Sequence, residues 1–111
     1  MSEIDPSMNP APLSSVDRKM YEQEYKKSAE LFEKALREFE STDNMYKKAA
    51  FKDVMDKAME VLNGAAAGLK DPKLLEQSDK ITRDYAAFQQ RETPISEAKL
   101  RKDLKEAKKS I

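Results

Sequence analysis

Carboxylates are the most numerous side chains in this chain that could carry acid–base chemistry. The 111 residues include 21 Asp and Glu, but no His and no Cys. The chain therefore lacks the usual general base, the thiol nucleophile and most ligands for transition metals. Carboxylates on segments this highly charged usually form a solvated face and not a catalytic pair. We expect no catalytic residue, no metal site and no cofactor, and we predict that the protein is not an enzyme.

The two glycines lie close together and separate two runs of helical periodicity. Gly64 and Gly68 cannot form a phosphate loop, because no Gly-Lys-Ser/Thr ending follows them. Their spacing imitates the small-residue motif of membrane helices, but the surrounding sequence is too polar for a membrane. We interpret the segment 62–72 as the hinge of an antiparallel helical hairpin. Gly68 would end one helix in the left-handed conformation, Asp71 would cap the next helix, and Pro72 would occupy its first position.

The hinge interpretation makes a prediction about one residue. If Gly68 has a positive φ, the substitution Gly68→Val should destabilise the fold by more than the ~1 kcal/mol expected from helix propensity alone. We therefore list Gly64, Gly68, Asp71 and Pro72 as the predicted hinge residues.

Helical spacing of apolar residues extends through most of the chain and predicts an all-α protein. We expect helices at about 15–40, 44–67, 72–91 and 95–110, within a single domain of residues 14–111. The segment Ser41 to Asn44 favours a break between the first two helices, and one continuous helix to Leu62 is the alternative. Residues 1–13 contain three prolines and are predicted to be a disordered tail. The architecture is either an antiparallel hairpin or a left-handed bundle of three to four helices.

The composition limits the size of the core and the kind of partner. The chain is 39% hydrophobic and 38% charged, so we expect a thin core made from one apolar stripe per helix. Its 21 basic residues balance its 21 acidic residues. A chain without net charge has no global field that would steer it to nucleic acid or to a membrane. We therefore expect a protein partner or self-association through amphipathic helices.

The last predicted helix is the most basic part of the chain. Six Lys and Arg oppose three Asp and Glu between residues 95 and 111. These cations could favour the helix C-terminus, or they could make a weak contact with an anionic surface. Replacing Lys102, Lys105 and Lys109 with Gln should change the stability by no more than about 1 kcal/mol. The candidate partner-binding residues are Leu100, Leu104, Ile111, Lys102, Lys105 and Lys109.

Two sequence features bear on localisation. No apolar run approaches the ~20 residues of a membrane span, and the N-terminus lacks the basic and apolar regions of a signal peptide. We expect a cytoplasmic protein that is not an integral membrane protein. Export by a route that does not cleave a signal peptide is the alternative.

One segment resembles a known family. The run Leu69 to Leu75, followed by Ile81, by Asp84-Tyr85 and by a lysine-bearing last helix, is similar to the C-terminal half of bacterial type III secretion needle and inner-rod subunits. The resemblance covers at most residues 58–111. It implies a helical hairpin that turns at an Asp-Pro or Asn-Pro loop and a C-terminal helix that polymerises.

These observations lead to two expectations about function. The first is a non-enzymatic helical protein–protein interaction module, such as an adaptor, a chaperone or an assembly factor. The alternative is a secreted subunit of a needle- or rod-like bacterial secretion assembly.

Overall fold

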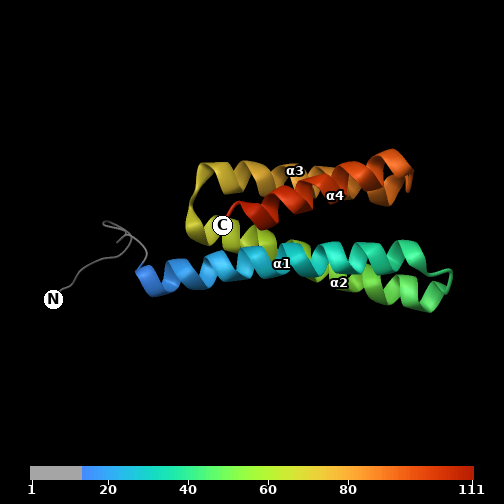
Figure 1. The fold of residues 1–111 in the computed structure, drawn as a ribbon, viewed down its shortest axis with the longest axis horizontal. Coiled ribbons are helices and arrows are strands. Elements are labelled where there is room, and N and C mark those ends of the chain that lie inside the picture. The colour runs from blue at the N-terminus through green and yellow to red at the C-terminus, as the bar shows by residue number, and fades with distance from the viewer. Residues whose placement is uncertain (1–13) are drawn as a thin grey trace.

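The computed structural model of the chain describes residues 14–111, and the predicted tail of residues 1–13 lies outside this range. The described part folds into four helices and contains no strand. Its fold is an all-α four-helix bundle (Figure 1). The helices are α1 (Ser15–Ser41), α2 (Met45–Leu69), α3 (Pro72–Gln90) and α4 (Pro94–Lys109).

Local sequence signals set the helix starts. Ser14, Asn44, Asp71 and Thr93 are the four N-caps, and each side chain accepts a hydrogen bond from a backbone N–H of the first turn. Such bonds satisfy donors that have no partner inside the helix. The chain therefore breaks between α1 and α2, as predicted, and the continuous-helix alternative is wrong. Residue Pro72 occupies the start of α3, so the predicted roles of Asp71 and Pro72 are confirmed.

The four helices form two hairpins that pack against each other (Figure 1). Helix α1 lies beside α2 and α4, and α3 lies beside α2 and α4. Among the described residues, the diagonal pairs α1–α3 and α2–α4 have no close backbone approach. Each helix therefore directs one face to a shared centre and has two neighbours.

Aromatic side chains cross this centre. The rings of Phe32 on α1 and Tyr85 on α3 meet edge to face with centroids 4.9 Å apart. Phe39 on α1 and Phe88 on α3 make a second edge-to-face contact, with ring centroids 6.0 Å apart. Edge-to-face packing is a favoured arrangement of aromatic pairs. Aliphatic and methionine side chains fill the rest of the core, including Leu36, Met55, Leu62, Ile81, Leu100 and Leu104.

The predicted hinge needs a correction at both glycines. Gly64 and Gly68 lie inside α2, and neither has a positive φ. The turn occurs at Lys70, whose φ of 54° is in the left-handed region. The helix continues past Gly68 because Leu69 is buried in the core, and the Lys70 N–H then closes the last turn by donating to the Ala66 carbonyl at 3.1 Å. The positive φ expected of Gly68 was therefore wrong.

The two glycines offer a matched pair of substitutions. A Cβ at Gly64 would meet no atom within 4 Å, so Gly64→Ala should stabilise the protein by about 0.5–1 kcal/mol through helix propensity. A Cβ at Gly68 would lie 2.6–2.9 Å from three ring atoms of Tyr21. Gly68→Ala should therefore lose this gain, and Gly68→Val should be destabilising for a steric reason. Urea unfolding of the variants measures the difference.

Tyr21 provides the control for this comparison. In a Tyr21→Ala background the clash is absent, so Gly68→Ala should recover the gain of about 0.5–1 kcal/mol seen at Gly64. If Gly68→Ala stabilises the unmodified chain as much as Gly64→Ala does, the Tyr21 ring does not lie close enough to Gly68 to obstruct a Cβ.

Candidate functional site

The apolar residues predicted to bind a partner from the last helix are part of the core. Leu100 and Leu104 each have 0% exposure. Helix α4 lies between α1 and α3, so its apolar line faces the centre of the bundle. The prediction that Leu100 and Leu104 bind a partner was therefore wrong. Ile111, just beyond the end of α4, is 40% exposed, and its role stays a prediction.

The basic residues of α4 fall into two groups. Lys99 pairs with Asp84 at 3.6 Å, Lys108 pairs with Glu33, and Arg101 pairs with Glu97 on its own helix. The pairs Lys99–Asp84 and Lys108–Glu33 join α4 to α3 and to α1. Neither pair was predicted from the sequence. The second group, Lys102, Lys105 and Lys109, is exposed and makes no ion pair with another residue of the described range. Contact of this group with an anionic surface stays a prediction.

Three carboxylates are buried, against the expectation of a solvated face. Glu33, Asp84 and Asp103 have exposures of 3%, 8% and 2%. Asp84 on α3 faces Asp103 on α4, and the Oδ2 atom of each carboxyl group is buried without a hydrogen-bond partner among the described residues. Burial, together with the neighbouring Asp84, raises the pKa of Asp103 to about 6, although Lys80 acts in the opposite direction. A protonated Asp103 can donate a hydrogen bond to Asp84.

Each member of the acid pair has a neighbouring cation. Lys80 approaches Asp103 at 3.4 Å, and Lys99 approaches Asp84 at 3.6 Å, so a cation accompanies each carboxyl group. Within residues 14–111, no group of three or more His, Cys, Asp or Glu side chains could hold a metal ion. The pair is therefore a polar contact between α3 and α4, where burial of charge affects stability.

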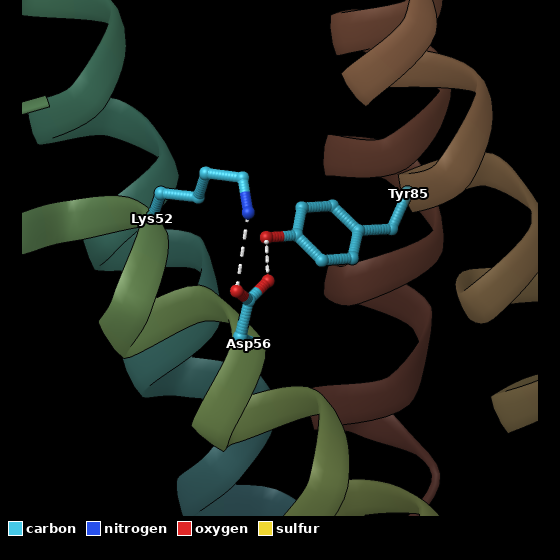
Figure 2. A network of polar contacts seen from close by, with 3 residues as sticks. All are labelled: Lys52, Asp56 and Tyr85. Carbon is cyan, nitrogen blue, oxygen red and sulfur yellow. Dashed lines mark hydrogen bonds and ion pairs between the residues drawn. The ribbon is translucent and has the colours of Figure 1, made fainter. Parts of the chain in front are cut away.

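A second polar network joins α2 to α3 (Figure 2). The Tyr85 hydroxyl donates to Asp56 Oδ1 at 2.5 Å, and Lys52 Nζ donates to Asp56 Oδ2 at 3.2 Å. Burial and the bond to Asp56 raise the pKa of Tyr85 well above its usual range. A tyrosine that acts as a base needs a lowered pKa, so the raised pKa does not suit Tyr85 to that role. The network holds the two helices in register.

Within residues 14–111, an apolar surface lies on the seam between α1 and α2. These two helices run side by side along their length (Figure 1). A hollow of about 250 Å³ has Leu31 and Val61 as walls and Ser28 and Ala58 beneath them. A second hollow of about 170 Å³ continues from Leu31. We call the two hollows together the α1–α2 groove, which is lined by Glu24, Lys27, Ser28, Leu31, Lys34, Ala35, Glu38, Phe51, Val54, Lys57, Ala58 and Val61.

The groove is apolar along its centre and charged along its rim. Leu31 is 48% exposed and Val61 is 46% exposed, whereas Phe51 and Val54 are partly buried against the core. All lining residues come from α1 and α2, so neither α3 nor α4 covers this surface. This apolar strip with its charged rim is a candidate surface for binding another protein.

Sequence reasoning missed this groove, although part of its signal was visible. Leu31 lies beside the main stripe of the first helix, and Val54 and Val61 widen the stripe of the second. Some apolar stripes are wider than a single contact with the core requires. Such a stripe indicates that the helix has a second apolar neighbour. Which of these residues remain exposed depends on where α3 and α4 pack, and that is a tertiary property.

Comparisons with known proteins add no further assignment. No protein-family model, curated protein or solved structure matches this chain significantly. Separately, none of the helices formed by residues 14–111 is both long enough and apolar enough to cross a membrane.

Proposed function

We propose that the protein is a non-enzymatic helical interaction module and that its binding surface is the α1–α2 groove. The observation that carries this proposal is an apolar groove between α1 and α2 that neither α3 nor α4 covers. Leu31 and Val61 remain half exposed, while Ile81 and Phe88 on α3 and Leu100 and Leu104 on α4 are buried. Burying exposed apolar surface is the main favourable contribution to most protein–protein association. We also propose that the protein is cytoplasmic, as expected from the sequence.

The shape of the groove favours a helix as the bound element. Its walls are side chains of two helices, whose backbone groups already bond within each helix, so no strand could add to them. Neighbouring helices pack 8–10 Å apart with side chains between them. A third helix can therefore lie in the seam and insert its apolar face between Leu31 and Val61.

The test uses an amphipathic helical peptide of about four turns, with leucines on one face and glutamine elsewhere. Titration followed by amide NMR should give saturable shifts at groove residues. Leu31→Glu or Val61→Glu should weaken binding by about tenfold or more, because each places a charge on the apolar strip. Ile95→Glu is the control, because Ile95 is 81% exposed and lies outside the groove.

The controls separate loss of binding from loss of folding. Because Leu31 and Val61 are half exposed in the free chain, both variants should keep the helical circular dichroism and unfold within about 1 kcal/mol of the wild type. The same peptide can also be made with Glu or Lys beside the leucine face. If none of these three peptides shifts the groove resonances, the proposed function is wrong.

A further inference from the structure

From the rim of the α1–α2 groove we infer the class of its partner: an amphipathic helix of another protein whose apolar face is flanked by acidic residues. This inference rests on the proposed function and adds the charge of the partner to it. Its basis is the placement of three lysines around the apolar centre.

The lysines surround the point where the two hollows meet. Lys27 and Lys34 lie one turn before and one turn after Leu31 on α1, and Lys57 approaches from α2. None of the three makes an ion pair with another residue of the described range. The two acids of the rim, Glu24 and Glu38, lie farther from Leu31 along α1. Among the lining residues, the charges nearest to Leu31 are therefore positive, and the two ends of the groove on α1 carry one acid each.

This arrangement disfavours a second copy of the chain as the occupant. If two copies met with α1 against α1 about a two-fold axis at Leu31, Lys27 of each would face Lys34 of the other, and Glu24 would face Glu38. If α1 met α2 of the other copy instead, Lys27 would face Lys57, because both residues line the same hollow. Like charges facing each other across an interface oppose association. The first arrangement is therefore repulsive. The second sets Lys27 against Lys57 but also Glu24 against Lys57, so neither arrangement is as complementary as a helix with acidic flanks.

The length of the groove sets the size of the bound segment. From Phe51 to Val61 the groove follows α2 for eleven residues, which span about 15 Å at 1.5 Å per residue step. A bound helix therefore contacts it over about three turns. Acidic residues one turn before and one turn after a central leucine would lie against Lys27, Lys34 and Lys57.

The experiment compares three peptides that share the same leucine face and differ only in the flanking residues, which are Glu, Gln or Lys. Fluorescence anisotropy at low salt should give a Kd for the Glu peptide about tenfold lower than that for the Lys peptide. Added salt should reduce the difference, because it screens exposed charges. The variant Lys27→Glu/Lys34→Glu/Lys57→Glu should invert the order and bind the Lys peptide best.

The triple variant Lys19→Glu/Lys47→Glu/Lys73→Glu is the matched control. It makes the same change in net charge on exposed lysines outside the groove, so it should keep the preference for the Glu peptide. If both triple variants change the preference equally, the effect comes from net charge and the inference is wrong. If the three peptides bind equally well at the groove, the inference fails and the proposed function stands.

Two further measurements address the other possible occupants. Sedimentation equilibrium should show a monomer at the peptide-binding concentration. Self-association that Leu31→Glu abolishes would make a second copy the occupant and overturn the inference. Residues 1–13 carry Glu3 and Asp5 and no basic residue. If their removal raises the affinity for the Glu peptide by about tenfold or more, the chain's own N-terminus is the competing acidic segment and the inference is again overturned.

Discussion

Replacing Asp103 with asparagine should stabilise the bundle at pH 7 by as much as about 3 kcal/mol, because a pKa raised from 3.8 to about 6 corresponds to that free energy. Asp103 is 2% exposed and faces Asp84 across the α3–α4 contact. Ionising both acids places two like charges in one buried contact. The asparagine amide has the shape of the protonated acid and can donate to Asp84.

The direction of the pH dependence follows from the raised pKa. The folded state holds the Asp103 proton more tightly than the unfolded state does. The stability contributed by this proton is therefore fully present below about pH 4 and is lost as the pH rises through about 6. Urea unfolding at several pH values should show the gain from Asp103→Asn growing between pH 4 and pH 7. Lys80 pairs with Asp103 while its own side chain is 47% exposed, so losing that pair should cost less than about 1 kcal/mol.

An exposed acid provides the comparison for this prediction. Asp53 lies exposed on α2, so Asp53→Asn should change the stability by less than about 0.5 kcal/mol at pH 7. A gain from Asp103→Asn that stays constant between pH 4 and pH 7 would show that Asp103 does not hold a proton in the folded state.

Lys108 should matter more for stability than the other lysines of the same helix. Its ammonium pairs with Glu33 on α1, and the Glu33 side chain is only 4% exposed. Lys108→Gln leaves this buried acid without its cation, which we expect to cost about 2–4 kcal/mol, because a buried charge that loses its partner has no compensating solvation. Chemical unfolding at pH 7 gives the value.

Two matched lysines and one double variant test the origin of this loss. Lys105 and Lys109 are exposed, so Lys105→Gln and Lys109→Gln should each change the stability by less than about 0.5 kcal/mol. The double variant Glu33→Gln/Lys108→Gln should recover most of the loss, because the buried charge is gone. If Lys108→Gln costs no more than Lys105→Gln, the pair between α1 and α4 does not contribute to the fold.

The sequence by itself determined the helices and most of their ends. The predicted ranges agree with α1 to α4 within two residues, because helix starts depend on residues a few positions apart. Asn44 and Asp71 show this most clearly, since each cap bonds to N–H groups two or three residues further on. The error at Gly68 has the complementary cause. Glycine permits a positive φ, but burial of Leu69 extended the helix and moved the turn to Lys70.

The tertiary structure decided which helix faces meet, and with them the site. Helical periodicity shows that Leu104 and Leu31 each lie on or beside an apolar stripe, but it does not identify the neighbour that a stripe contacts. Packing between α1 and α3 buries Leu104 completely, whereas Leu31 remains 48% exposed on the outer seam. The proximity of Asp84 to Asp103 likewise depends on the pairing of α3 with α4. Contacts between helices depend on how all four apolar faces are buried together, and that information is not local in the sequence.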